Sequence, residues 1–215
     1  MSNIKTETHL QDALDSEFAW RIKEISTLKI LVKTGRGIHA NTAVRAGIPI
    51  LYAHWEGFIK KSATYYLEYI NNQRFKYKEL KSCFVVFGIK RHINALVESK
   101  SSSVLIEALE FIRANMDERA KLKVESAIRT EFNLSSKVFS NIGKALGLQL
   151  SWYEPRYNLI DESLLNRRNT IAHGEYLDVD ANGFRDLADE VILLLRTFKT
   201  DIENAVSLQS FKSAA

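Results

Sequence analysis

The chain alternates long stretches whose apolar residues recur every three or four positions with short polar breaks. This spacing places apolar side chains on one face of an α-helix. The first such stretch begins at Thr8, which with Gln11 resembles a capping box. It ends near Gly35 and Gly37. The pattern predicts an amphipathic first helix with apolar positions Leu10, Leu14, Phe18, Ile22, Ile25 and Leu28.

A second helix is predicted from Asn41 or Thr42 to about Ile70. Pro49 lies inside it, and because proline lacks the amide donor that a helix interior uses, a long bent helix is expected. Apolar residues form two stripes along this segment rather than one. A helix that is apolar on two sides lies in the middle of a bundle. One stripe consists of Trp55, Ile59, Tyr66 and Ile70.

The middle of the chain gives weaker patterns. Residues 76–95 are predicted as a helix, although adjacent valines leave some strand character. Residues 99–103 form a polar linker before a helix that carries Leu105, Ile106, Leu109 and Ile112. Between residues 115 and 133 the pattern is poor, and the alternation over 121–125 fits either an extended segment or a loose helix.

The last third of the chain contains clearer helix signals. Ser135 or Ser136 is expected to cap a short helix that Gly147 ends. A turn at Asn182-Gly183 precedes the most regular amphipathic helix, and the tail from about residue 207 is expected to fray. Together these elements predict an all-α bundle of antiparallel helices, with residues 1–215 as one domain.

The composition agrees with one globular domain. The 215 residues are 46% hydrophobic and 26% charged, which is ordinary for a folded protein. The formal net charge is +4, a mild basic surplus that permits nucleic-acid binding without requiring it. Any single basic cluster is more simply a solvated helix face.

The lone cysteine and the apolar runs limit the other classes. Cys83 excludes an intramolecular disulfide and a multi-cysteine zinc site, and its apolar neighbours favour burial. The N-terminus lacks the apolar core of a signal peptide, and no stretch approaches the eighteen or more apolar residues of a membrane span. We therefore expect a cytoplasmic protein.

The most informative chemistry lies between Arg167 and Glu175. If the helix of residues 161–165 continues to Gly174, Arg168, Asn169 and His173 occupy neighbouring parts of one flank. Arginine remains charged and its planar fork matches phosphate oxygens, whereas histidine exchanges a proton near neutrality. RNA cleavage requires these two abilities and in principle needs no metal or other cofactor. The simpler interpretation is a solvated face whose histidine complements a helix C-terminus.

Arg168-Asn169 followed by His173-Gly174 resembles the Arg-x(4–6)-His motif of HEPN domains, which are all-helical and often act as metal-independent endoribonucleases. Residues 51–60 are also similar to a helix in one group of stand-alone prokaryotic HEPN proteins. The resemblance extends over about residues 40–205. It implies a homodimer in which two motifs form one composite cleft.

The resemblance also implies roles for individual residues. His173 would act as general base or acid, Arg168 would stabilise the phosphate, and Asn169 would hold the phosphate or fix the imidazole tautomer. Arg167 would be a secondary phosphate contact, and two further residues, Glu175 and Tyr176, would shape the cleft. In some HEPN toxins a tyrosine two residues after the histidine is modified by a partner enzyme. Glu175 occupies that position here.

The resemblance leaves the biological setting open between a toxin of a toxin–antitoxin pair, with an antitoxin as partner, and an antiphage defence effector. A non-catalytic HEPN module that binds RNA, nucleotide or a partner protein is the alternative function. A purely structural helical adaptor is a third interpretation. His54 and Glu56 also have two interpretations, as polar contacts inside the bundle or as residues that orient a catalytic side chain.

Overall fold

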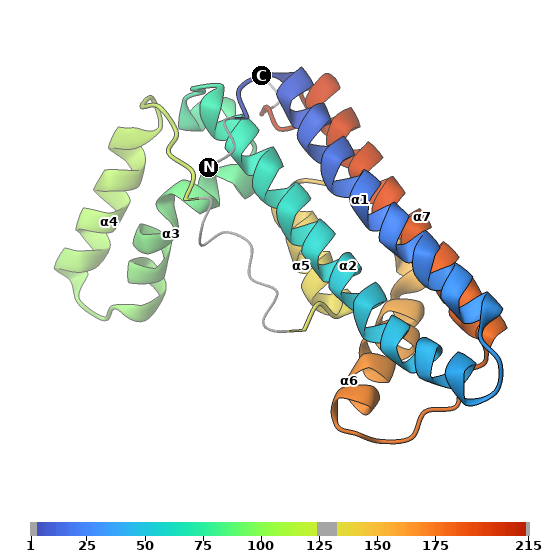
Figure 1. Ribbon diagram of the computed structural model, residues 1–215. Coiled ribbons are helices and arrows are strands. Elements are labelled where there is room, and N and C mark those ends of the chain that lie inside the picture. The colour runs from blue at the N-terminus through green and yellow to red at the C-terminus, as the bar shows by residue number, and fades with distance from the viewer. Residues whose placement is uncertain (1–3, 124–132, 214–215) are drawn as a thin grey trace.

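The computed structural model describes residues 4–123 and 133–213, and seven α-helices dominate them. Three long helices, α1 (Glu7–Thr34), α2 (Ile38–Asn72) and α7 (Ala181–Ser207), pack side by side along most of the molecule (Figure 1). The described residues contain isolated β-bridges but no strand. The predicted all-α bundle is confirmed.

Helix α2 forms the centre of the molecule because it packs against α1 and α7 and also against η4 (Leu159–Asn166) and α6 (Arg167–Ala172). Its side chains are buried on more than one side, as two apolar stripes predict. Pro49 lies inside α2, in agreement with a single long helix. The fully buried apolar residues of α2 are Ile48, Leu51, Trp55, Phe58, Ile59, Ala63 and Leu67.

Several predicted boundaries differ from the structure by a few residues. Thr6, not Thr8, caps α1, because its hydroxyl accepts a hydrogen bond from the His9 amide at 3.1 Å. Helix α2 begins at Ile38, before the predicted start at Asn41 or Thr42. The expected turn at 182–183 lies inside the first turn of α7, where Asp180 accepts from the Gly183 amide at 2.6 Å.

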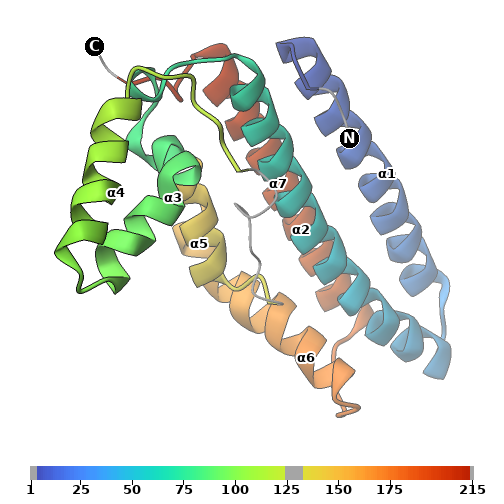
Figure 2. The ribbon, with the colours of Figure 1, turned by 90° about the vertical axis from the view of Figure 1, so that its left-hand side faces the viewer.

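A short 3₁₀ turn, η1 (Tyr77–Glu79), leads into a hairpin of two helices, α3 (Ser82–Glu98) and α4 (Ser102–Asn115). The adjacent valines of α3 are helical, so the strand alternative was wrong there. Figure 2 shows this hairpin at one side of the bundle, with α4 farthest out. The thiol of Cys83 at the base of α3 is half-buried, and this burial raises its pKa.

Residues 116–123 cross back from α4 without forming a helix, which agrees with the extended alternative. The Ala120 amide donates to the Phe75 carbonyl at 2.8 Å, and Lys76 forms an isolated bridge with Arg119. Ala120 and Leu122 are buried. The rest of this weakly patterned region, residues 124–132, lies outside the described residues.

The chain then forms α5 (Ser136–Ala145), which Ser135 caps and which Gly147, at φ +67°, follows. Both features were predicted. A 3₁₀ turn η3 (Glu154–Arg156) precedes η4 (Leu159–Asn166) and α6 (Arg167–Ala172). The predicted helix before the motif is therefore present, but η4 is a π-helix. π-Helical turns are rare and occur often at functional sites.

The C-terminal tail does not fray at residue 207 as expected. Phe211 is buried and packs against Tyr69 and Phe75, with ring centroids 6.2 and 5.6 Å away. Backbone hydrogen bonds join Phe211 to Lys81 and Ser213 to Glu79. Burial of one aromatic ring therefore fixes the tail. No described helix is long and apolar enough to cross a membrane.

Candidate active site

Helix α6 ends in a turn that leaves His173 at its tip. The His173 amide donates to the Asn169 carbonyl at 2.9 Å, and the Glu175 amide donates to the Thr170 carbonyl at 3.0 Å. Gly174 has φ +77°, a left-handed conformation that glycine adopts without a Cβ clash. The His173 side chain is exposed. The imidazole therefore lies where a bound molecule could reach it.

Arg168 lies at the other end of α6 and faces the bundle. Its guanidinium carbon is 4.1 Å from the centre of the Tyr52 ring, and its Nη2 donates to Asn133 Oδ1 at 2.6 Å. Tyr52 belongs to α2 and is 4% exposed, whereas Asn133 precedes α5. A flat guanidinium over an aromatic face is attracted by the ring electrons. Two separate segments thus fix the direction of the Arg168 cation.

The Tyr52 hydroxyl is itself held in place. It accepts a hydrogen bond from the Leu134 amide at 2.6 Å. Burial is the largest effect on the pKa of Tyr52 and raises it. The hydrogen bonds with Leu134 and Arg168 lower this pKa, and the Glu56 carboxylate raises it. Tyr52 is therefore a neutral phenol at physiological pH. Glu56 therefore influences this site electrostatically, through its effect on the pKa of Tyr52.

The loop after the motif is also attached to α2. Arg45 Nη1 donates to the Glu175 carbonyl at 2.9 Å. Tyr176 is 81% exposed, and Arg167 and Asn169 are partly exposed on α6. The predicted site residues thus all lie on α6 and the loop that follows it, and α6 is at the lower end of the molecule in Figure 1.

Asp161 of η4 connects the motif helix to α5. Its Oδ1 accepts from the Ser136 amide at 2.7 Å, and its Oδ2 accepts from the Ser136 hydroxyl at 2.5 Å. A carboxylate that accepts two hydrogen bonds at a helix start stabilises both partners. The segment that supplies Asn133 and Leu134 to the site is therefore anchored directly beside it.

His54 points away from this site, toward α1. Its Nδ1 is 3.4 Å from Arg21 Nη1, and its Nε2 is 3.0 Å from a carboxylate oxygen of Glu24. Because a guanidinium only donates, Nδ1 accepts and Nε2 carries the proton. Burial lowers the pKa of His54; Glu24 raises it and Arg21 lowers it. Of the two interpretations for His54, the contact inside the bundle is confirmed.

Three residues that the sequence pattern did not indicate contribute to the site: Tyr52, Asn133 and Arg45. Tyr52 lies within the stretch 51–60 that carried the second part of the resemblance, so that stretch could have indicated it. Asn133 lies in the weakly patterned stretch 115–133, and Arg45 lies in the predicted second helix, where no local feature marks it as a contact of the loop after α6. Among the described residues, no three side chains of His, Cys, Asp or Glu are grouped to hold a metal ion.

The model of the MAE_28990-like HEPN family matches residues 10–211. The chain belongs to the HEPN family. No curated protein and no solved structure shows a match to it. The family resemblance predicted from the motif is therefore confirmed, and it covers more of the chain than expected.

In this HEPN protein the match includes every residue of the candidate site, from Arg45 on α2 to Tyr176 after α6. The match establishes the family and an all-helical fold. HEPN domains include ribonucleases and nucleotide-related proteins, so family membership by itself permits both kinds of activity.

Proposed function

We propose that this HEPN protein is an endoribonuclease that cuts RNA without a metal ion. A base removes the proton of a ribose 2′-hydroxyl, and the oxygen attacks the adjacent phosphorus. The bond to the 5′-oxygen then breaks, and an acid protonates that oxygen. The products are a 2′,3′-cyclic phosphate and a 5′-hydroxyl, so atoms and charges balance without a redox partner.

The fixed Arg168 guanidinium is the observation that supports this proposal most. Its stacking on Tyr52 and its hydrogen bond to Asn133 set its direction before any substrate binds. A pre-positioned cation stabilises charge that develops on a phosphorane and needs no reorganisation during the reaction. In this proposal Arg168 stabilises that charge, while Asn169 contacts the phosphate and Arg167 adds a weaker contact.

The exposed His173 supplies the proton transfer. One imidazole can act as base or as acid, but the cleavage needs both. Two copies of the chain, related by a two-fold axis beside α6, would supply two imidazoles to one cleft. The proposed active unit is therefore a homodimer, with Glu175 and Tyr176 at the rim of the cleft. The proposed setting is a toxin of a toxin–antitoxin pair or an antiphage defence effector.

We test this function with total RNA and a structured tRNA in EDTA. His173→Ala is expected to reduce cleavage at least about a hundredfold, the lower range for a positioned acid or base. The fold should persist because the side chain is exposed. His9→Ala, which changes another exposed histidine, is the matched control and should cut like wild type. Full activity of His173→Ala would contradict the mechanism.

A second candidate is a HEPN module that binds RNA or nucleotide without cutting it. The engagement of Arg168 with its own chain favours this interpretation, because a guanidinium with partners on two sides can be purely structural. This candidate predicts no cleavage by folded wild-type protein, together with RNA or nucleotide binding that a folded Arg168→Ala variant retains.

A further inference from the structure

The hairpin of α3 and α4 is only partly supported by the rest of the molecule. Helix α4 packs mainly against α3 and stands away from the bundle in both side views (Figures 1 and 2). All of α4 is described, and Ala108 alone among its 14 residues is buried. Isolated helices of this length are marginally stable in water, and an apolar helix face is normally covered.

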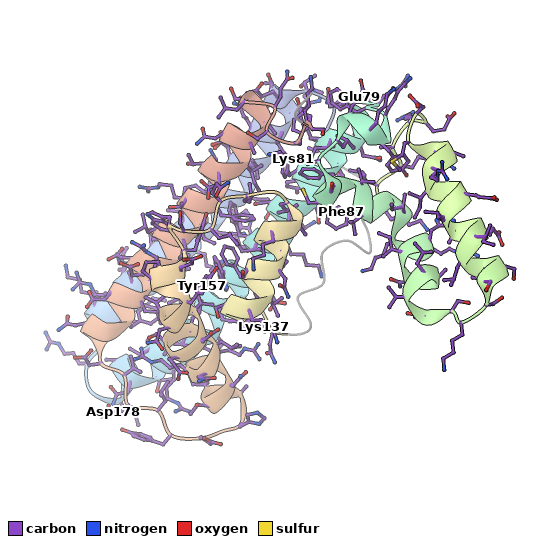
Figure 3. All side chains as sticks on the ribbon, turned by 180° about the vertical axis from the view of Figure 1, so that it is seen from behind. Glu79, Lys81, Phe87, Lys137, Tyr157 and Asp178 are labelled. Atoms are coloured by element: carbon purple, nitrogen blue, oxygen red, sulfur yellow. The ribbon has the colours of Figure 1, made fainter. Side chains whose placement is uncertain are left out.

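The base of this hairpin is well attached. The Lys78 amide donates to the Met116 carbonyl at 2.9 Å, and Phe84 and Phe87 join the core. Phe87 is labelled on α3 in Figure 3. The hairpin therefore holds a fixed direction relative to the bundle, and its open sides are presented to solvent in a defined way.

Half of the large apolar side chains that are exposed in the described residues lie on this hairpin. On α3, Val86 and Val97 are 41% and 79% exposed. Ile93 is partly buried and also packs against the core. The three follow one another at seven and four residues, which keeps them on one face. Ile106 and Leu109 are three residues apart on α4 and are 56% and 49% exposed. We refer to these five residues as the hairpin face.

The residues of the hairpin face lie on the same side of both helices. His92 and Phe111 stack across the other side, with ring centroids 3.7 Å apart. Successive residues of an α-helix are about 100° apart around its axis, so Ile93 and Val97 lie on a different side of α3 from His92. The same rotation separates Ile106 and Leu109 from Phe111 on α4. The hairpin face is thus one surface, two helices wide.

We propose that the hairpin face is a contact between two copies of this chain, which pair their hairpins as a four-helix bundle. Two antiparallel hairpins that meet through one apolar side form such a bundle, the architecture in which paired helices bury their apolar stripes. This contact goes beyond the proposed ribonuclease function, because α6 and the candidate active site lie at the opposite end of the molecule (Figure 1).

The area is sufficient for a specific contact. Helix α3 has 17 residues and is therefore about 25 Å long. Two helices side by side are about 20 Å wide, so each copy contributes roughly 500 Å² and the pair about 1,000 Å², the smallest size expected of a specific interface. The centre of this area is apolar, as in the core of a homodimer interface.

The charges beside the hairpin face favour one arrangement. Lys90 on α3 and Glu110 on α4 are both exposed. Each is ten residues from Lys100 in the turn, so the two residues lie at a similar distance from the turn along the hairpin. They occupy the outer edges of the hairpin face. If a two-fold axis parallel to the helices of the hairpin relates the two copies, Lys90 of each copy lies beside Glu110 of the other copy. Opposite charges then meet across the interface.

The position of the main bundle agrees with this arrangement. Phe84 and Phe87 bind α3 to the bundle on the side away from α4. The parallel two-fold axis stacks α3 of one copy on α4 of the other, so the two bundles lie on opposite sides of the paired hairpins. Neither bundle then covers the hairpin face of the other copy.

The decisive experiment measures the mass of the full-length protein in solution by light scattering and sedimentation over a range of concentrations. Ile106→Glu combined with Leu109→Lys preserves net charge and replaces two half-exposed side chains. We expect this variant to have half the mass of the wild-type assembly. The matched control, Ile30→Glu with Leu31→Lys, changes two exposed apolar residues of α1 and should keep the wild-type mass.

A charge exchange tests the arrangement itself. Lys90→Glu alone should weaken self-association, and adding Glu110→Lys should restore it, because both inter-copy pairs are then re-formed with reversed signs. Equal masses of wild type and the Ile106/Leu109 variant, or a monomeric wild type, would overturn the proposal. His173→Ala should leave the mass unchanged, so loss of cleavage and loss of assembly are separate outcomes.

Discussion

At the scale of single residues, the shape of the Arg168 cation matters as much as its charge. Lysine has neither the plane that stacks on Tyr52 nor the fork that reaches Asn133 and a phosphate together. Arg168→Lys should therefore lower kcat/KM for RNA cleavage by about a hundredfold or more, the effect of removing one charge-stabilising donor. Initial rates in EDTA with a defined RNA measure this change.

The neighbouring Arg167 provides the control for this substitution. It is partly exposed on the same helix, so Arg167→Lys keeps the charge near the site without disturbing the stack on Tyr52. We expect little change in its kcat/KM. Equal activities of the two lysine variants would show that only the local charge is used.

At the scale of elements, Asp161 joins η4 to α5. Asp161→Ala removes the acceptor of the Ser136 amide and hydroxyl, and should lower the free energy of unfolding by about 1–2 kcal/mol, as for a lost helix cap. Urea denaturation measures the change. Glu162→Ala is the control, because Glu162 is exposed and accepts a hydrogen bond from Asn166, a residue of its own helix. Equal stabilities would contradict the anchoring role.

At the scale of the whole molecule, the contact between α1 and α2 should make stability depend on pH. Burial lowers the pKa of His54, so the folded protein keeps it neutral while the unfolded chain takes up a proton below about pH 6.5. The unfolded state then binds more protons, and stability falls as pH decreases through this window, by up to about 1.4 kcal/mol per pH unit. Urea denaturation between pH 8 and 5, roughly spanning the histidine range, measures the slope.

His54→Gln isolates this contribution. Its amide can accept from Arg21 and donate to Glu24 but does not titrate, so the slope should decrease relative to wild type. His173→Gln changes an exposed histidine and should keep the wild-type slope. Parallel stability curves for wild type and His54→Gln would contradict the assignment.

The amino-acid pattern by itself determined the helices and the ends of several of them. Helices α1, α2 and α7 were predicted because an apolar period of three to four residues is a local property of the chain. The helix end at Gly147 was predicted for a similar reason, since a helix end needs a residue that accepts positive φ. The motif from Arg168 to His173 was sufficient to indicate the family, because its residues are close together in the chain.

Only the tertiary structure decided which partners these side chains have. Tyr52 and Asn133 meet Arg168 from distant parts of the chain, and no local period encodes that contact. His54 lies within the predicted second helix, but only packing determined that its side chain faces Arg21 of α1. The tail is fixed for the same reason, because the Phe211 ring packs against both Tyr69 and Phe75. Period and capping are local, whereas contacts between side chains depend on how whole helices pack.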